Sequence, residues 1–298
     1  MAQLALLVTG GRGQLGSDLA ALGGRTGTVR APGSAELDIT SDTAVRMAVA
    51  QLAEEAHTAG RHPIVVNAAA YTAVDAAEAD EATAHLVNAH GPAVLARMCA
   101  EFGVPLIHVS TDYVFAGDAT QPYEPDDETG PRSVYGHTKL AGEQAVLAAA
   151  DQAWIVRTAW VYGTTGANFV KTIARLEGER DTLSVVDDQH GSPTWSADLA
   201  AGLLDLAEHI AAGRQPAERV LHRTGAGETT WFGLARAVFE ELGADPARVN
   251  PCTTADFPRT APRPAYSVLS DRTWSAAGLV PALPWRSALT RFFGKFHG

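Results

Sequence analysis

The stretch that decides the fold reads Leu4-Ala5-Leu6-Leu7-Val8-Thr9-Gly10-Gly11-Arg12-Gly13-Gln14-Leu15-Gly16. Its first five residues are apolar on both faces, which is typical of a parallel strand buried in the middle of a sheet. The glycines that follow allow a tight turn, and the helix expected at Gln14–Leu22 begins directly behind them. The N-terminus of that helix offers free N–H groups to a phosphate. This order of elements predicts a dinucleotide-binding unit.

The glycine loop fits two spacings and leaves two other interpretations to weigh. Gly11, Gly13 and Gly16 match G-x-G-x-x-G, while Gly10, Gly13 and Gly16 match G-x-x-G-x-x-G. A tight turn without a ligand is one alternative. A P-loop is the other, but Ser17 stands where that motif carries its phosphate-binding lysine, so the P-loop is excluded.

The first half of the chain continues the alternation of strand and helix. Short apolar runs predict strands, and these lie at Ile64–Val66, Val104–Val109 and Trp154–Val156. Amphipathic stretches predict the intervening helices, at Thr43–His57, Glu81–Phe102 and Tyr135–Ala150. Strands that alternate with helices predict a doubly wound, parallel α/β sheet of Rossmann type.

After about residue 165 the rhythm changes. Helices are expected at Phe169–Glu177, Ala197–Ala211 and Trp231–Leu242, joined by irregular segments rich in Pro and Gly. We expect residues 1–165, with return segments at about 182–222, to form the dinucleotide-binding domain. Residues of about 166–181 and 223–298 then form a smaller C-terminal lobe that binds the substrate.

The tip of the second strand predicts the choice of cofactor. An acidic residue there holds the ribose of NAD, whereas an arginine accommodates the 2′-phosphate of NADP. The segment Thr28–Pro32 places Arg30 at the tip, with Arg12 close by in the glycine loop. This favours NADPH, with NADH as the alternative because Glu36 and Asp38 follow soon after.

Tyr135 and Lys139 stand at positions i and i+4 of one expected helix, so they share a face. The chain has only three lysines, Lys139, Lys171 and Lys295, which makes a chance pairing with a tyrosine uncommon. A free tyrosine is a slow acid at neutral pH, and a nearby ammonium stabilises its phenolate. The pair therefore predicts general acid catalysis of carbonyl reduction, against the alternative of an exposed helix with a stray aromatic.

A second hydroxyl is needed to hold the carbonyl oxygen of the substrate. Ser110 and Thr111 follow the strand Val104–Val109, and ligands of doubly wound sheets bind at the carboxyl ends of the strands. A bound diphosphate would also require arginines in the second lobe. Arg223, Arg259 and Arg263 are the candidates, with Arg263 favoured by its place in the proline-rich loop.

Composition excludes several classes of protein. A formal net charge of −11 argues against non-specific nucleic-acid binding. The apolar run at the N-terminus is too short for a signal peptide, and no stretch is long enough for a membrane span. Cys99 and Cys252 cannot form a disulfide framework, and the histidines show no metal spacing. We therefore expect a cytoplasmic protein without a bound metal.

Five longer sequence strings restrict the choice of family. Together they resemble the dTDP-4-dehydrorhamnose reductase family of extended short-chain dehydrogenases. The resemblance covers nearly the whole chain. The strings are Asn67-Ala68-Ala69-Ala70-Tyr71-Thr72-Ala73-Val74-Asp75, Ser110-Thr111-Asp112-Tyr113-Val114-Phe115, Val134-Tyr135-Gly136-His137-Thr138-Lys139-Leu140-Ala141-Gly142-Glu143, Arg157-Thr158-Ala159-Trp160-Val161-Tyr162-Gly163 and Asp188-Gln189-His190-Gly191-Ser192-Pro193-Thr194.

The resemblance implies reduction of dTDP-4-dehydro-β-L-rhamnose to dTDP-β-L-rhamnose, the last step in making this activated sugar. It makes Tyr135 the proton donor, Lys139 the ligand of the nicotinamide ribose, and Thr111 the group that polarises the C4 carbonyl. It implies further ligand contacts for two sets of residues. For the cofactor these are Gly10, Gly13, Gln14, Leu15, Gly16, Asp38, Ile39, Ala70, Tyr71 and Thr72, and for the sugar nucleotide Asp112, Tyr113 and Trp160.

Some members of the family bridge a dimer with Mg²⁺ through glutamates. The corresponding places here hold Asp18 and the stretch Trp195–Asp198, so we expect no such metal and a monomer or weak homodimer.

Three other functions share parts or all of the pattern. A regulatory relative binds NADP and partners a methionine adenosyltransferase, but it would not need Tyr135, Lys139 and Thr111. A sugar-nucleotide epimerase would retain its NAD. A talose-forming reductase would share every string quoted.

Overall fold

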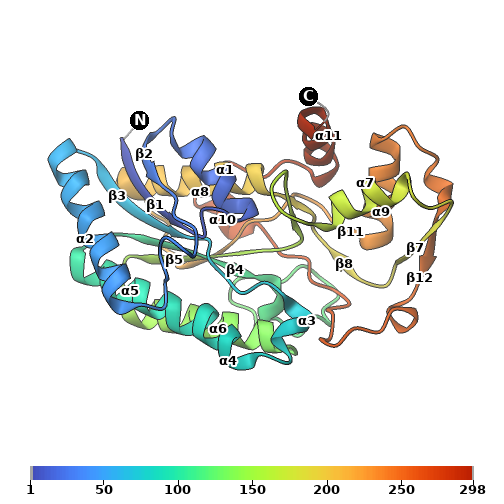
Figure 1. Cartoon of the computed structure of the whole chain (residues 1–298), viewed down its shortest axis with the longest axis horizontal. Coiled ribbons are helices and arrows are strands. Elements are labelled where there is room, and N and C mark those ends of the chain that lie inside the picture. The colour runs from blue at the N-terminus through green and yellow to red at the C-terminus, as the bar shows by residue number, and fades with distance from the viewer. Residues whose placement is uncertain (1–2, 297–298) are drawn as a thin grey trace.

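The computed structural model describes residues 3–296, and its centre is a six-stranded sheet in the order β10-β5-β4-β3-β1-β2. Every pairing within this sheet is parallel, as the alternation of elements predicts (Figure 1). The fold class expected from the sequence is confirmed. The strands are β1 (Leu4–Thr9), β2 (Gly27–Arg30), β3 (His62–Asn67), β4 (Leu106–Thr111), β5 (Ala153–Thr158) and β10 (Val220–His222).

Helices cover both faces of the sheet. One face carries α1 (Gln14–Gly23) and α8 (Ser196–Ala211), and the other carries α2 (Asp42–Ala59), α5 (Gly91–Phe102) and α6 (Val134–Ala149), seen above and below the sheet in Figure 1. Strand β1 shows why its residues are apolar throughout. Leu4 and Leu6 pack toward α1 and α8, whereas Ala5 and Leu7 pack toward α2 and α5. Both sides of the strand are therefore core.

The expected helix at Glu81–Phe102 is interrupted by one wide turn. It consists of α4 (Glu81–His85), the π-helical turn η1 (Leu86–His90) and α5. Pro92 has no N–H for the carbonyl of Asn88, and its ring crowds that carbonyl, so the helix widens there. The freed oxygen of Asn88 lies against Gly142 of α6, where a Cβ would come within 2.1 Å of it. The side chain of Asn88 is thereby turned toward the loop after β3.

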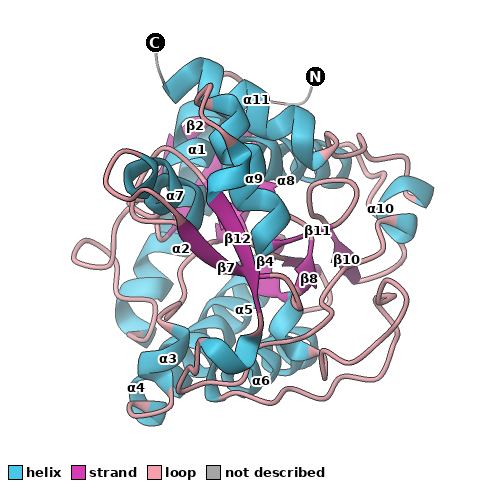
Figure 2. Cartoon of the chain, turned by 90° about the vertical axis from the view of Figure 1, so that its right-hand side faces the viewer, coloured by secondary structure: helices cyan, strands magenta, loops and turns pink. Residues whose placement is uncertain are grey.

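The second half of the chain builds a lobe with its own core (Figure 2). Helices α7 (Phe169–Glu177), α9 (Trp231–Glu241) and α11 (Trp285–Phe296) form it together with short strand pairs. The pairs are β6 (Val161–Tyr162) with β9 (Thr194–Trp195), β7 (Leu183–Val186) with β12 (Val249–Cys252), and β8 (His190–Gly191) with β11 (Thr229–Thr230).

Remaining short elements connect these parts. They are α3 (Val74–Ala77), the 3-10 turns η2 (Asp112–Val114), η3 (Pro246–Arg248) and η4 (Thr254–Asp256), and α10 (Arg272–Ala276). Within residues 3–296, no helix combines the length and the apolar character that a bilayer crossing requires.

The chain passes between the two parts repeatedly. Helix α8 and strand β10 rejoin the main sheet, whereas β7 pairs with β12 in the lobe, so the expected return near residue 182 begins later, at α8. After α9 the chain comes back once more, because Trp274 of α10 packs in the core beneath α8. Strand β7 instead has its parallel partner in β12, from Val249↔Leu183 to Cys252↔Val186.

Candidate active site

A cleft of about 560 Å³ opens at the carboxyl ends of β1, β3, β4 and β5. This is where a doubly wound sheet holds its ligands. Most residues predicted to touch a ligand line this single cleft. They are Gly10, Gly13, Gln14, Leu15, Gly16, Asp38, Ile39, Ala70, Thr72, Thr111, Asp112, Tyr113, Tyr135, Lys139 and Trp160.

The glycine loop leaves the start of α1 open. Helices α2, α6, α7 and α9 each begin at a residue whose side chain accepts a hydrogen bond from the first turn, but α1 begins at Gly13 with no such cap. Gly16 allows the loop to pack closely, since a Cβ there would lie 2.2 Å from the carbonyl oxygen of Gly10. The uncapped N–H groups face a cleft and fit the pyrophosphate of a dinucleotide.

Tyr71 lies outside the residues that line the cleft. Its backbone N–H donates to Asn88 Oδ1 at 2.8 Å, and its carbonyl accepts from Asn88 Nδ2 at 3.1 Å. The same amide donates to Thr138 of α6 at 3.1 Å. The π-helical turn therefore fixes the loop after β3 and places its neighbours Ala70 and Thr72 at the cleft.

Arg30 also lies outside the cleft, contrary to the expectation from its place at the strand tip. In the register of the sheet it stands beside Leu7, whose side chain faces α2. Its guanidinium accordingly points to Glu55 of α2, with 3.8 Å between the charged atoms. Arg12 does line the cleft, where it donates to Glu36 at 3.0 Å. The backbone N–H of Gly33, and then Arg12, hold the pKa of Glu36 below its usual value.

Tyr135 and Lys139 lie on the first turns of α6, which the side chain of Ser133 caps at the N–H of Gly136. Burial raises the pKa of Tyr135 to about 12, and the nearby Thr111 hydroxyl opposes this rise. Burial also lowers the pKa of Lys139 to about 8, against the opposing effect of Glu143. A buried acid, a hydroxyl and a readily titrated cation thus meet at the end of β4.

Asp112 and Tyr113 form the turn η2 directly after Thr111. The Thr111 hydroxyl donates to Asp112 Oδ1 at 2.9 Å, and burial raises the pKa of Asp112 to about 6. The ring of Tyr113 meets the ring of Tyr135 edge-on at 5.5 Å. These contacts give the cleft a polar wall beside the tyrosine hydroxyl.

Trp160 forms the opposite wall, at the passage from β5 into the lobe. It is the only non-glycine residue with a positive φ, 48°, among those described. Its ring stacks on Trp231 of α9 at 3.6 Å, and Gly191 lies so close that a Cβ there would come within 2.3 Å of the indole. The lobe therefore clamps this ring in a backbone conformation that costs energy for a bulky residue.

Arg263 lies beside the cleft rather than in it. It donates to Asp75 Oδ2 at 2.7 Å and lines a small pocket on the other side of Tyr113. Arg259 stands exposed in the same loop.

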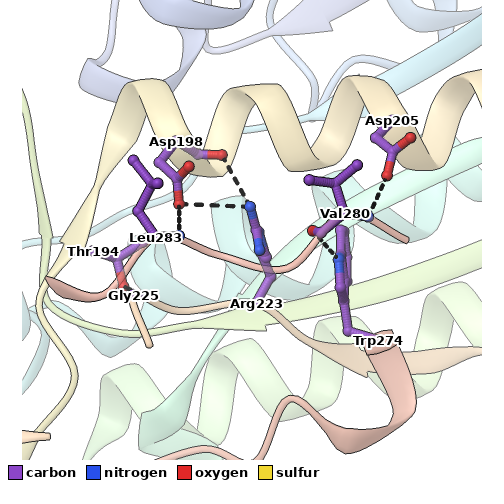
Figure 3. A network of polar contacts seen from close by, with 8 residues as sticks. All are labelled: Thr194, Asp198, Asp205, Arg223, Gly225, Trp274, Val280 and Leu283. Carbon is purple, nitrogen blue, oxygen red and sulfur yellow. Dashed lines mark hydrogen bonds and ion pairs between the residues drawn. The ribbon is translucent and has the colours of Figure 1, made fainter. Parts of the chain in front are cut away.

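Arg223 is a structural residue, which corrects the expectation that it is a candidate for binding a diphosphate. It is 2% exposed, lies 3.5 Å from Asp198 of α8, and stacks over Trp274 at 5.2 Å (Figure 3). Asp198 also accepts from the backbone of Leu283 at 3.2 Å. The group fastens the returning segments of the chain to α8.

Of the polar residues beneath the site, His108 lies in none of the quoted sequence strings. His108 of β4 is fully buried and lies 3.5 Å from Lys139 Nζ. Its sequence signal is a single histidine inside an otherwise apolar strand. Glu143, one turn beyond Lys139, pairs with buried Arg157 at 2.8 Å.

Metal ligands do not gather among residues 3–296, since no group of three or more His, Cys, Asp or Glu side chains is placed to hold an ion. Asp18 and Asp198, at the two places where the resemblance implied a metal bridge, are engaged within the chain. Asp18 accepts from the Ser196 hydroxyl, and Asp198 holds Arg223.

The profile of the family described as RmlD substrate binding domain matches residues 4–297. The chain belongs to this family. A relative from Mycobacterium tuberculosis, named dTDP-4-dehydrorhamnose reductase, is 53% identical over 95% of this chain and 90% of its own length. One from Streptomyces antibioticus is 50% identical over 96% and 94%, and is named as a probable dTDP-4,6-dihydroxy-2-methyloxan-3-one 4-ketoreductase.

A solved RmlD-family structure matches the whole architecture. The dTDP-4-dehydrorhamnose reductase of Bacillus anthracis in complex with NADP superposes with a TM-score of 0.89 at 34% identity, covering 99% of this chain and 100% of that one. The family expected from the motifs is thus confirmed by sequence and by fold.

Proposed function

We propose that this RmlD-family chain is an NADPH-dependent reductase that converts dTDP-4-dehydro-β-L-rhamnose to dTDP-β-L-rhamnose. The observation that carries the proposal is the meeting of Tyr135, Thr111 and Lys139 in a cleft that the uncapped α1 also faces. The relatives named as reductases at about half identity support the substrate. A regulatory subunit would need the glycine loop but not this buried acid.

The chemistry follows from where the protons lie. When bound, the nicotinamide supplies the hydride that C4 receives. Tyr135, protonated at neutral pH because its pKa is raised, gives the proton to the carbonyl oxygen. The Thr111 hydroxyl, held at the end of β4, donates a hydrogen bond to the same oxygen. Lys139 stabilises the phenolate left on Tyr135 and binds the nicotinamide ribose.

The glycine loop would hold the cofactor in this proposal. The N–H groups of Gln14 and Leu15 would bind its pyrophosphate, and Asp38 and Ile39, which line the same cleft, would bind its adenosine end. Arg12, rather than Arg30, is the arginine on the cleft and binds the 2′-phosphate. The NADP complex of the Bacillus anthracis relative supports this choice of nucleotide.

The sugar nucleotide lies between Tyr113 and Trp160, with Asp112 at the sugar hydroxyls. Arg263 is placed beside Tyr113 and serves the diphosphate once its ion pair with Asp75 opens.

We also propose that the protein works in the cytoplasm. We propose that it is a monomer or weak homodimer, because Asp18 and Asp198 are occupied within the chain and are not free to bridge two subunits. Analytical ultracentrifugation with and without Mg²⁺ tests this. A stable dimer that dissociates when Mg²⁺ is removed would contradict it.

A second candidate substrate comes from the Streptomyces antibioticus relative, whose name specifies another dTDP-linked ketosugar. The deciding experiment supplies each ketosugar with NADPH and identifies the product by NMR. We expect dTDP-β-L-rhamnose from the first and little turnover of the second. The C4 epimer, or a preference for the second sugar, would refute the proposed substrate. No reaction with either would refute the proposed activity.

A further inference from the structure

A chain of buried polar groups runs beneath the site from β1 to α6. The Thr9 hydroxyl donates to Asn67 Oδ1 at 2.6 Å, and Asn67 Nδ2 lies 2.9 Å from His108 Nδ1. His108 Nε2 in turn lies 3.5 Å from Lys139 Nζ. All four residues are at most 2% exposed. Buried polar groups require partners, so each proton in this chain has a defined place.

The backbone fixes the direction of the chain. The N–H of Ala69 donates to Asn67 Oδ1 at 3.1 Å. A backbone N–H can only donate, so this contact identifies the oxygen of the Asn67 amide and leaves its NH₂ group facing His108. His108 Nδ1 is therefore an acceptor. A neutral imidazole that accepts at Nδ1 carries its single proton on Nε2.

This tautomer is locked. A second proton on His108 would have to sit on Nδ1, where it would meet the NH₂ group of Asn67. Burial, followed by the charge of Lys139, holds the pKa of His108 well below its usual value. The Nε2–H group thus faces Lys139 at every physiological pH.

The contact distinguishes the two forms of the lysine. A neutral amine has a lone pair that accepts from an N–H group, whereas an ammonium has only donors. The carbonyl of Val109 accepts from Lys139 at 2.7 Å in either form. The imidazole N–H therefore favours the amine and opposes the ammonium.

We propose that His108 is a positioning residue, oriented by Asn67 and Thr9, that directs an N–H group at Lys139 and thereby eases release of the lysine proton. What that proton does rests on the proposed reduction. Tyr135 gives one proton to the carbonyl oxygen in each turnover, Lys139 passes one to the phenolate, and solvent returns one to Lys139. Each residue ends the cycle in the state in which it began.

Other titratable groups surround the lysine. Asp112 follows β4, Tyr135 and Glu143 share α6 with Lys139, and Arg157 of β5 binds Glu143. Glu143 opposes His108, because its carboxylate raises the pKa of Lys139.

The test uses the low lysine content of the chain. Protein labelled with ¹³C-lysine has only Lys139, Lys171 and Lys295 to observe by NMR, and Lys139→Met assigns the signal of interest. His108→Asn retains an acceptor for Asn67 and removes the Nε2–H group that faces Lys139, while the longer His108→Gln can offer an amide oxygen to the lysine. We expect both variants to raise the pKa of Lys139 by about one unit, a tenfold change in equilibrium, with the larger rise in His108→Gln.

Two further measurements complete the test. His222→Asn changes another buried histidine, on β10, and should leave the Lys139 titration unchanged. The alkaline limb of kcat/KM should move upward with the pKa in both His108 variants. An unchanged or lower Lys139 pKa in folded His108 variants overturns the inference. Because NMR reads the lysine without substrate, a raised pKa in a protein that does not reduce the sugar upholds the inference and refutes only the proposed function.

Discussion

Helix α6 carries two buried charged residues on one face, Lys139 and Glu143, and their partners differ. Tyr135 and Lys139 occupy its first turns and face the cleft, and Glu143 follows at the next i+4 position. Glu143 is fully paired, because Arg157 donates to it at 3.0 and 2.8 Å. Arg157 also donates to the carbonyl of Pro125 at 3.1 Å and stacks over Phe115 at 4.9 Å. Among the described residues, Lys139 has a carbonyl and an imidazole as partners but no hydrogen-bonded carboxylate.

This difference between Glu143 and Lys139 shows that one helix can carry a stabilising ion pair and a titratable catalytic residue side by side. A lysine paired with Glu143 would be a permanent cation with little tendency to exchange its proton. Arg157 occupies the carboxylate instead, so Lys139 remains buried with a pKa of about 8. Because Arg157 binds Glu143 at the third turn of the helix, Lys139 at the second turn is left without a carboxylate partner.

The largest effect is expected where the helix meets the substrate. Tyr135→Phe removes the proton donor and should lower kcat by about 10²–10⁴-fold, the usual contribution of general acid catalysis. Cofactor binding and the midpoint of urea unfolding should change little. Tyr162→Phe is the control, since Tyr162 is a buried tyrosine that packs on Phe292 in the lobe. Comparable losses of kcat in the two variants would remove Tyr135 from the chemistry.

The next effect is on stability. Arg157→Met leaves Glu143 buried without a partner and should lower the free energy of unfolding by about 3–5 kcal/mol. The double variant Glu143→Leu/Arg157→Met should recover most of that loss. Arg46→Met breaks an exposed pair with Glu101 and should cost only about 0–1 kcal/mol. Urea denaturation compares the three, and equal losses at the buried and exposed pairs would contradict the contrast drawn along α6.

Activity and stability should change in opposite directions as the pH rises above 8. Lys139 has a pKa of about 8 when folded and an ordinary value of 10.5, so the unfolded state binds more protons between these values. Its contribution to stability therefore rises with pH across this window. Activity that needs the ammonium should fall, by up to about tenfold per pH unit above 8. Stability and activity are measured against pH for the wild type and for Lys139→Met. If the curves of the two proteins run parallel across this window, Lys139 does not titrate within it.

The smallest effect lies outside α6, at the exposed arginines. Arg12→Gln should raise KM for NADPH about fivefold and leave KM for NADH unchanged, since an exposed ion pair contributes at most about 1 kcal/mol. Arg30→Gln is the control, because its guanidinium faces Glu55 away from the cleft. If Arg30→Gln alone weakens NADPH binding, the strand tip selects the nucleotide after all.

Local patterns predicted most of the fold and much of the cleft. The glycine loop and the Tyr135–Lys139 pair each depend on spacing within one segment, which the sequence states directly. Arg30 and Arg223 were misplaced because the direction of a side chain depends on the register between strands and on helices far along the chain. Arg30 follows Leu7 to the α2 side, and Arg223 meets Asp198 of α8.

His108 was missed for a related reason. Its importance comes from the proton directions that Ala69 and Asn67 impose, and these residues lie on another strand. A single histidine in an apolar strand is as typical of a core residue as of a functional one. The wide turn at Leu86–His90 was hidden by the continuous helical pattern, although Pro92 supplied its cause.

The repeated passage of the chain between the sheet and the lobe bears on how such proteins diverge. The lobe is assembled from separate stretches, with α8 and β10 between β9 and β11, and α10 between α9 and α11. A single crossover between two genes cannot exchange the lobe alone, because it would also exchange α8, α10 and the edge strand β10 of the sheet. New sugar preferences in this architecture must therefore accumulate by point substitution around Trp160, or arise through several matched exchanges at once.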